Sequence, residues 1–252
     1  RCGTSLSDHE MSDADAYQND TCLAIFFKCP IKNSNNDILV WTTTPWTLTA
    51  NVAVAVNPEF DYNIVKVKSQ NRNIIVCADL MKVLKDDVVE VVKTVKGAEL
   101  VGSTYETCFP DLSEQKFEHK IVAWDEVQKT EGTGAVHIAP GCGDADFELG
   151  KSLGLKQICP INESGIYYDN FGVFAGKNAN CDETRDFVFD LMKQNGKLYY
   201  THKYTHSYPH CWRCKNPLLF RLVDQWVIKM DELRPQLIKA IEPVDFQPDF
   251  MK

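Results

Sequence analysis

Short apolar segments, rich in Val, Ile and Thr, recur through the middle of this 252-residue chain about a dozen residues apart, with turn-forming residues between them. Such a series is typical of a β-barrel or a β-sandwich. The chain is therefore predicted to have a mixed, β-rich fold with a barrel-like core decorated with helices. The segments that carry this pattern are 38–44, 51–56, 62–67, 73–78, 88–95, 120–127 and 134–140.

Four other segments have helical signals, and one further segment, 22–30, is predicted to be a strand. In the most regular of the four, Phe187, Val188, Leu191 and Met192 fall on one helical face, and Gly196 stands where a helix is expected to end. Asp144 or Asp146 can occupy the first turn of another, where carboxylates suit the exposed N–H groups. The predicted helices are 78–87, 143–155, 182–198 and 230–241, the last with Pro235 near its first turn.

The overall composition is that of an ordinary globular protein, with 44% apolar and 25% charged residues. No apolar run approaches the roughly 20 residues that span a membrane, and we expect a cytoplasmic monomer. The net charge of −8 and pI of about 5.3 do not indicate a basic face. The opening RCGTSLSDHE is neither a signal peptide nor a transit peptide, and without an initiator Met it suggests a cut inside a larger chain.

Ten cysteines are scattered along the chain, and only Cys211 and Cys214 form a close pair. This pattern favours a reducing compartment, with most thiols acting as small buried hydrophobes. The pair can supply half of a tetrahedral zinc site, and Cys2 is followed by a knuckle-like turn that can contribute to the other half. His206 and His210 are alternative ligands. A reduced surface pair without metal is the other interpretation.

A threonine row, WTTTPWTLTAN, runs from Trp41 to Asn51. On a strand, Thr42 and Thr44 would share one face, and Pro45 would end the hydrogen-bonded ladder. One interpretation is an edge strand of high β-propensity. The other is a wall of hydroxyl groups, each able to donate one hydrogen bond and accept two, that holds a water and a ribose or carbonyl oxygen.

A second motif, GTGAVHIAPGCGDADF, spans 132–147 and brackets His137 and Asp146 with glycines and a proline. The glycines allow the backbone to approach a ligand closely. Taken singly, His137 can be a satisfied core residue and Asp146 a helix-start carboxylate. Taken together, nine residues apart across a turn that contains Pro140, Gly141 and Gly143, they can converge on one pocket, where a buried carboxylate suits a ligand ammonium.

Basic and aromatic residues alternate through 193–215. This segment can contact an RNA backbone and stack on bases. A solvated loop beside a metal knuckle has the same composition and is the interpretation that we favour. The residues concerned are Lys193, Lys197, Tyr199, Tyr200, His202, Lys203, Tyr204, His206, Tyr208, His210, Trp212, Arg213 and Lys215.

The threonine row and the His–Asp motif together resemble the editing domain of isoleucyl-tRNA synthetases, the insertion called CP1 in these class I enzymes. SYPHCWRCKNPLLFRLVDQWVIKM and RCGTSLSDHE resemble the returning and opening knuckles of that domain, so the resemblance covers essentially the whole chain. Valyl and leucyl relatives typically have TTRP at 42–45 and lack a histidine at 137. Thr49 departs from the family pattern, which usually has proline there, and this puts the rigidity of the loop in doubt.

The resemblance implies an aminoacyl-tRNA deacylase that hydrolyses valine from mischarged valyl-tRNA(Ile) with a positioned water. By the same resemblance, Asp146 anchors the α-ammonium of the amino acid, and His137 lies against its side chain and the ribose. The implied catalytic residues are Thr42, Thr43, His137 and Asp146, and the implied substrate-binding residues are Trp41, Thr44, Thr47, Asn51, Gly134 and Ala135. Cys2, Cys211 and Cys214 are the implied ligands of a structural zinc, and editing itself is expected to need no cofactor.

Three regions follow from the resemblance. Residues 1–36 are the opening knuckle and lead-in strand, 37–200 the editing core, and 201–252 the returning knuckle and connection to a catalytic domain. The implied partners are the 3′ end of tRNA(Ile) carrying valine and the rest of the ATP-binding synthetase in cis, with no membrane. HIGH and KMSKS motifs are absent, so no synthetic site is expected in this chain. A non-catalytic RNA-binding or zinc-knuckle module, or an editing domain of valyl or leucyl type, are the alternatives.

Overall fold

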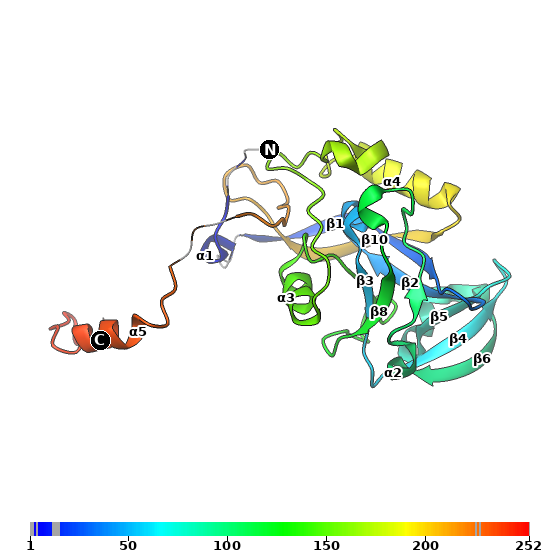
Figure 1. Cartoon of the computed structure of the whole chain (residues 1–252), viewed down its shortest axis with the longest axis horizontal. Helices are drawn as coiled ribbons and strands as arrows, with labels where there is room; N and C mark the ends of the chain where they lie inside the picture. Colours follow the sequence, from blue (N-terminus) through cyan, green and yellow to red (C-terminus); the bar gives the residue numbers. More distant parts are fainter. Residues whose placement is uncertain (1–2, 4, 12–15, 225, 227, 252) are drawn as a thin grey trace. The chain divides into compact units, whose positions relative to one another are not determined.

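The computed structural model of the chain describes residues 3, 5–11, 16–224, 226 and 228–251. It divides into two compact units, Arg1–Leu222 and Val223–Lys252. In the described part of the first unit, ten strands form one mixed sheet (Figure 1). The second unit contains α5 (Arg234–Ile241), with proline in its first turn as predicted, and the 3₁₀ turn η5 (Asp249–Met251).

The strands include every segment that the sequence pattern predicted. They are β1 (Tyr17–Pro30), β2 (Asn36–Thr42), β3 (Ala53–Val56), β4 (Asp61–Val67), β5 (Asn73–Cys77), β6 (Val88–Lys96), β7 (Thr104–Tyr105), β8 (His119–Ala123), β9 (Ala135–Ile138) and β10 (Leu198–Pro209). Strand β10 contradicts our expectation of a solvated loop in the basic and aromatic segment. Residues 198–209 pair with β1 in an antiparallel ladder that begins at Tyr17 and Pro209.

The sheet runs in the order β6-β4-β5-β2-β9-β3-β8-β7, and β1 joins it by pairing with β2 on one side and β10 on the other. Strand β2 thus has three neighbours, because β5 pairs with its start and β9 with its end. This half-barrel arrangement confirms the predicted β-rich, barrel-like core. It also shows that the edge-strand interpretation of the threonine row was wrong, since β2 lies inside the sheet.

Short helices and 3₁₀ turns fill the connections between strands. They are α1 (Asp8–Met11), η1 (Pro45–Ala50), η2 (Ala78–Asp87), α2 (Gly97–Leu100), η3 (Ser113–Gln115), α3 (Asp144–Leu153), η4 (Asp169–Phe174) and α4 (Asp182–Gln194). The helix predicted at 78–87 is instead two 3₁₀ segments with a kink at Lys85, whose φ is +51°. The helix predicted over 182–198 ends at Gln194, followed by Gly196 at φ +67°.

Helix α4 covers the sheet near β10 and η1 (Figure 1). Its buried positions, Thr184, Val188 and Met192, are four residues apart and therefore lie on one face. Beneath it, the core is one apolar cluster that contains most of β2, β3 and β5. The η1 turn lies within this core, with all six of its residues buried.

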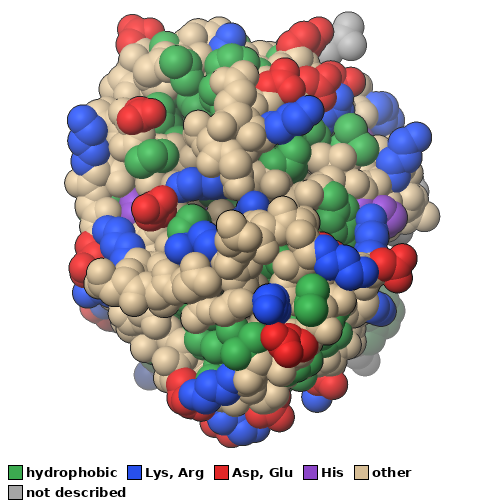
Figure 2. All heavy atoms as spheres, turned by 90° about the vertical axis from the view of Figure 1, so that its right-hand side faces the viewer, with side chains coloured by type: hydrophobic (Ala, Val, Ile, Leu, Met, Phe, Trp, Pro, Cys, Tyr) green, Lys and Arg blue, Asp and Glu red, His purple; other side chains and the backbone are tan. Residues whose placement is uncertain are grey.

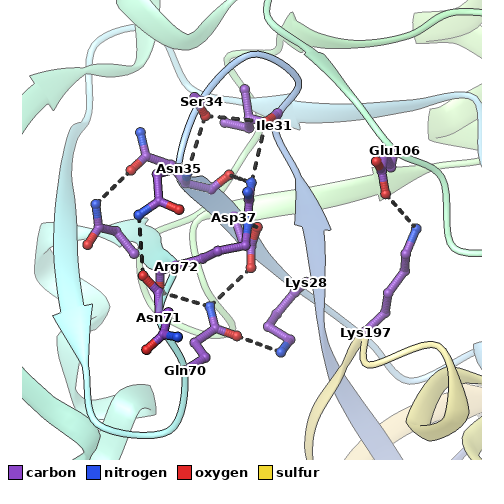
Figure 3. A network of polar contacts seen from close by, with 12 residues as sticks. Lys28, Ile31, Ser34, Asn35, Asp37, Gln70, Asn71, Arg72, Glu106 and Lys197 are labelled. Atoms are coloured by element: carbon purple, nitrogen blue, oxygen red, sulfur yellow. Dashed lines mark hydrogen bonds and ion pairs between the residues drawn. The ribbon is translucent and has the colours of Figure 1, made fainter.

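A buried ion pair fastens the start of β2 to the β4–β5 hairpin (Figure 3). Arg72 Nε lies 2.5 Å from Asp37 Oδ1, and Gln70 Nε2 donates to Asp37 Oδ2 at 3.0 Å. Arg72 also donates to the carbonyl of Asn36 at 2.9 Å, and Lys28 donates to Gln70 at 2.6 Å. Since the Asp37 side chain is only 4% exposed, these donors compensate a carboxylate that would be costly to bury alone.

Candidate functional site

The threonine row lies where β2 gives way to η1. Strand β2 ends at Thr42, and the helical turn begins at Pro45, a favoured first position because proline has no N–H to lose there. The Thr42 hydroxyl accepts the backbone N–H of Thr44 at 3.1 Å and lies 3.2 Å from the Thr44 hydroxyl. Thr42 and Thr44 therefore face the same side, and both are partly exposed.

His137 lies in the middle of β9, paired with Val54 of β3, as its apolar neighbours predicted. Its Nε2 is 2.9 Å from Thr47 Oγ1, and its Nδ1 is 2.8 Å from Asn51 Nδ2. The residue is 7% exposed, and burial lowers the pKa of its imidazole from 6.5 to about 3. His137 is consequently neutral near neutral pH, with both ring nitrogens bonded within the protein.

Asp146 lies in the first turn of α3, as expected for a helix-start carboxylate. It is partly buried, and this burial raises the pKa of its carboxyl group, while the Ala139 N–H opposes the rise. Oδ2 accepts that N–H at 2.9 Å, which is the only hydrogen bond of this carboxylate within the described part of the chain. Ala139 is two residues beyond His137, so this bond ties the start of α3 to the end of β9.

Three of the predicted substrate-binding residues flank this region. The Trp41 ring stacks on Phe26 with ring centroids 5.9 Å apart, and it meets Tyr204 edge-on at 5.0 Å. Gly134 and Ala135 open β9, where the Gly134 carbonyl accepts the hydroxyl of Tyr62 at 2.5 Å. Gly134 has φ +73°, and a Cβ there would lie 2.3 Å from Cys77 Cβ, so its glycine serves close packing of backbone against core.

Hydrogen bonds thus link most of the residues that the sequence singled out. Thr47, Asn51 and His137 form a directly bonded cluster, to which Thr44 is joined through its carbonyl. Asp146 is joined through the backbone at Ala139. Thr43, another member of the row, lines a neighbouring pocket.

That pocket, of about 230 Å³, lies between the threonine row and the β1–β10 ribbon. Thr43, Thr44 and Trp46 line one side of it, and side chains of the ribbon and the start of α4 line the other. The ribbon residues are Asp20, Thr21, Cys22, His206 and Tyr208. The row is therefore accessible from this side.

Sequence reasoning missed the residues that support Asn51. Tyr105 donates its hydroxyl to Asn51 Oδ1 at 2.7 Å, and His119 Nε2 lies 3.2 Å from the Asn51 carbonyl. Gln115 Nε2 donates at 2.9 Å to the carbonyl of Thr49. These residues lie 54 to 68 positions from their partners along the chain. The only signal that could have identified them is that they are polar side chains buried in a β-rich core.

Thr49, the departure from the family pattern, is wholly buried. Its hydroxyl donates to the carbonyl of Trp46 at 3.0 Å, inside the same helical turn. The turn is held from outside as well, because the Tyr167 hydroxyl donates to the same carbonyl at 2.7 Å. A threonine at this position is thus compatible with a fixed turn.

The structure supplies only part of the predicted zinc site. Among the residues it describes, no three His, Cys, Asp or Glu side chains are grouped so that they could hold a metal ion, and Cys2 lies outside the described residues. His210 binds Asp20 through Nε2 and the Tyr208 carbonyl through Nδ1, so it does not serve as an alternative ligand. Asn216 donates to Cys214 Sγ at 3.5 Å within a tight turn. Two cysteines do not complete a tetrahedral site, and zinc stays a prediction.

The sequence of this chain is similar to those of isoleucine–tRNA ligases. The isoleucine–tRNA ligase of Clostridium novyi (strain NT) is 39% identical over 250 residues, which cover 99% of this chain and 24% of that protein. The isoleucine–tRNA ligase of Methanothermobacter thermautotrophicus is 38% identical over 252 residues, covering 99% and 23%. The enzyme of Pyrococcus horikoshii is 39% identical over 267 residues, covering 100% and 24%. No family model matches.

This chain is a relative of the isoleucine–tRNA ligases. It spans about a quarter of the length of the relatives it matches. Its fold is that of a CP1 editing domain: the GlLeuRS-CP1 crystal structure superposes with a TM-score of 0.56 at 14% identity, covering 71% of this chain and 98% of that one. The cytosolic leucyl-tRNA synthetase editing domain of P. knowlesi gives 0.55 at 12% identity, covering 74% and 98%.

The relationship to isoleucine–tRNA ligases agrees with the expectation drawn from the paired motifs. In the same described residues, no helix has the length and apolar character needed to cross a membrane. Of the cysteines predicted to be small buried hydrophobes, Cys29, Cys77, Cys108 and Cys142 are buried, whereas Cys22, Cys159 and Cys181 are partly exposed.

Proposed function

We propose that this segment is a post-transfer editing domain that hydrolyses the ester of valyl-tRNA(Ile). The observation that carries the proposal is the arrangement of Asp146, a partly buried carboxylate bonded at the end of β9, with a neutral His137 on that strand and the threonine row joined to His137 through Thr47. The relationship to isoleucine–tRNA ligases and the CP1 fold support it. In this proposal, 37–200 form the editing core, and the regions on either side connect it to the rest of the synthetase.

Asp146 is suited to hold the α-ammonium group, the one cation that every aminoacyl ester carries. One of its oxygens accepts the Ala139 N–H, which orients the carboxylate and leaves the other for a ligand. Because Asp146 is partly buried, an ion pair formed there is weakened less by solvent than one at the surface. Asp144, in the same turn, is exposed.

The hydroxyl groups of Thr42, Thr43 and Thr44 would hold the attacking water and the ribose. Water forms a bond to the ester carbonyl carbon, the bond from that carbon to the ribose oxygen breaks, and a proton from water ends on the ribose oxygen. Aminoacyl esters are already activated, so positioning and electrostatic stabilisation can supply the rate. His137 is not a free base in this scheme, because Asn51 occupies its Nδ1.

His137 would instead form part of the wall beside the amino-acid side chain and the ribose. Its burial and fixed hydrogen bonds make this wall rigid, and a rigid wall can reject the longer isoleucine. A second sieve of this kind is needed because one methylene gives only about 1–3 kcal/mol of discrimination, a limit defined on this enzyme family rather than on the present chain.

The tRNA would be presented with the help of the rest of the synthetase. The net charge of this segment is −8, and on the face drawn in Figure 2 basic and acidic side chains are interspersed rather than gathered into separate patches. Since binding to a phosphate backbone depends on clustered Lys and Arg, we expect weak affinity of the segment alone for tRNA.

The test is deacylation of valyl-tRNA(Ile) by the wild-type chain, by Asp146→Ala and by Asp144→Ala. Both variants remove one carboxylate from the first turn of α3 and have the same net charge. We expect Asp146→Ala to abolish hydrolysis and Asp144→Ala to keep it, with circular dichroism confirming that both are folded. Hydrolysis by Asp146→Ala at the wild-type rate would refute the assigned role of its carboxylate.

Selectivity is tested with isoleucyl-tRNA(Ile). If His137 forms the rejecting wall, His137→Ala should cleave the isoleucyl ester as well as the valyl ester, while wild type cleaves only the valyl ester. Unchanged selectivity in this variant would argue against His137 as the wall.

A further inference from the structure

A continuous chain of hydrogen bonds runs from the buried core to the threonine row. The Tyr105 hydroxyl donates to Asn51 Oδ1 at 2.7 Å, and Asn51 Nδ2 lies 2.8 Å from His137 Nδ1. His137 Nε2 lies 2.9 Å from Thr47 Oγ1, which donates to the Thr44 carbonyl at 2.8 Å. Four bonds thus join β7, β9 and η1.

The amide of Asn51 determines which group donates and which accepts in each hydrogen bond of this series. Its Nδ2 also donates to the Ala53 carbonyl at 2.9 Å, while its Oδ1 receives the Tyr105 hydroxyl. A carbonyl oxygen cannot donate and an amide nitrogen cannot accept, so the amide can satisfy these partners in one orientation only. The amide therefore donates to His137 Nδ1, and the ring proton must be on Nε2.

The remaining bonds follow from that tautomer. With its proton on Nε2, the imidazole donates to the hydroxyl of Thr47, whose own proton goes to the carbonyl of Thr44. Every member of the chain donates towards the threonine row. Tyr105 and Asn51 are each 1% exposed and Thr47 is 5% exposed, so water does not compete readily for these bonds.

The ionisable members of the chain are neutral. Burial lowers the pKa of His137 to about 3, and it raises the pKa of Tyr105 well above 10. The phenol therefore keeps the proton that it donates to Asn51, and the imidazole keeps one proton. This agrees with the direction obtained from the geometry.

We infer that Tyr105 and Asn51 are positioning residues of the proposed editing site, which hold His137 as its Nε2–H tautomer and, through Thr47, fix the carbonyl of Thr44. The catalytic consequence rests on the proposed function, whereas the tautomer does not. Asn51 had been predicted to bind substrate, but the bonds of its side chain account for both amide hydrogens and for one lone pair of its oxygen. Its work in this arrangement is to orient His137.

The first experiment is nuclear magnetic resonance on wild-type protein labelled with ¹⁵N-histidine. Long-range proton–nitrogen correlations distinguish the two neutral tautomers and the charged ring, and comparison with His137→Gln assigns the signal. We expect His137 to be the Nε2–H tautomer at neutral pH. An Nδ1–H or charged ring would overturn the inference.

The second experiment compares Tyr105→Phe with Tyr167→Phe. Both remove one buried tyrosine hydroxyl, and the Tyr167 hydroxyl supports η1 through Trp46 without entering the chain to His137. In Tyr105→Phe, the His137 signal should shift or split as the Asn51 amide loses its partner. In Tyr167→Phe it should stay at the wild-type position. Equal spectra in the two variants would remove Tyr105 from the inference.

Kinetics connect this result to editing. Asp146, which is proposed to bind the ammonium group, lies outside this chain of hydrogen bonds. Tyr105→Phe should therefore lower kcat for valyl-tRNA(Ile) about tenfold and leave KM within about twofold. Tyr167→Phe should leave kcat closer to the wild-type value and KM within the same about twofold range. A change in KM alone would contradict the positioning role. If wild type cleaves no ester even with the rest of the synthetase added in trans, but shows the Nε2–H tautomer, the proposed function fails while the assignment of the tautomer stands.

Discussion

The chemistry of His137 is determined by its burial and by its hydrogen bonds within the core. The sequence left two interpretations open, a satisfied core residue and a member of a site. In the structure, both ring nitrogens of His137 are hydrogen-bonded, Nδ1 to Asn51 and Nε2 to Thr47, and Thr47 belongs to the threonine row. The two interpretations are compatible, because the core contacts are what hold the ring in place.

The depressed pKa of His137 predicts a pH-dependent stability. The unfolded state binds a proton near pH 6.5 and the folded state only near pH 3, so stability is fully present above pH 6.5 and is lost as the pH falls towards 3. From pH 7 to pH 5, wild type should lose about 2 kcal/mol through this group. Urea unfolding of wild type and His137→Gln at both values measures the difference.

The difference between wild type and His137→Gln isolates the contribution of His137 to the pH dependence of stability. His119, whose pKa is also lowered by burial, is present in both proteins, so its contribution cancels when the two are compared. An equal loss of stability in wild type and His137→Gln would show that His137 does not titrate as its burial requires.

The hydroxyl of Thr47 should contribute more to the stability of the fold than the hydroxyl of a surface threonine. Thr47→Val removes the acceptor of the His137 N–H and one of the two donors to the Thr44 carbonyl, and the buried His137 N–H left unpaired should cost about 1–3 kcal/mol. Thr94→Val removes an exposed hydroxyl that donates to Asn63 and should change stability by no more than about 0.5 kcal/mol. Urea midpoints measure both, and equal effects would contradict the buried network.

At the scale of elements, the sequence predicted the strands well because a half-buried strand imposes Val- and Ile-rich runs between turns. It predicted α3 and α4 from their acidic first turns and apolar spacing. It did not predict η1, since the threonine-rich PWTLTA has high β-propensity, yet these six residues form a 3₁₀ turn that is buried in the core. Nor did it predict β10, whose polar and aromatic residues alternate along a ribbon instead of filling a core.

The turn before β9 depends on glycine for space as well as for conformation. Gly134 and Gly154 both have positive φ, +73° and +64°. A Cβ at Gly134 would lie 2.3 Å from the Cβ of Cys77, whereas a Cβ at Gly154 would meet no atom within 4 Å. Gly154→Ala should therefore cost about 1 kcal/mol for strain, and Gly134→Ala about 1–3 kcal/mol more for overpacking against Cys77.

Thermal unfolding of the two glycine variants separates these contributions. A Gly134→Ala variant as stable as Gly154→Ala would mean that β9 can shift away from Cys77. The position of His137, three residues further along β9, would then be less fixed than the structure indicates.

At the scale of the whole molecule, the two motifs that identify the family lie far apart in sequence and meet in the sheet, where β2 pairs with β9 at Trp41 and Val136. Their spacing could not predict this pairing. The long-range polar contacts of Asn51 with Tyr105 and His119 could not be predicted either, because each partner is a single polar residue without a local motif. The sequence predicted candidate members of the site, and the sheet determines which of these residues touch.

The unit Val223–Lys252 should add little to the stability of the rest. No residue of α5 is buried, and Trp226 and Ile228 are largely exposed. A chain ending at Leu222 should therefore unfold within about 2 °C of the full chain, as expected when less than about 1 kcal/mol is lost. Differential scanning calorimetry tests this, and a drop of 10 °C or so would show that these residues support the core.

The central claim is that this segment removes valine, and not isoleucine, from the isoleucine tRNA. The most direct measurement follows the loss of each amino acid from valyl- and isoleucyl-tRNA(Ile) with the wild-type chain, alone and with the rest of the synthetase added in trans. The account predicts that valine is released and isoleucine retained, with the added part increasing the rate by presenting the tRNA. Retention of both esters in the presence of the added part, or equal release of both, would contradict it.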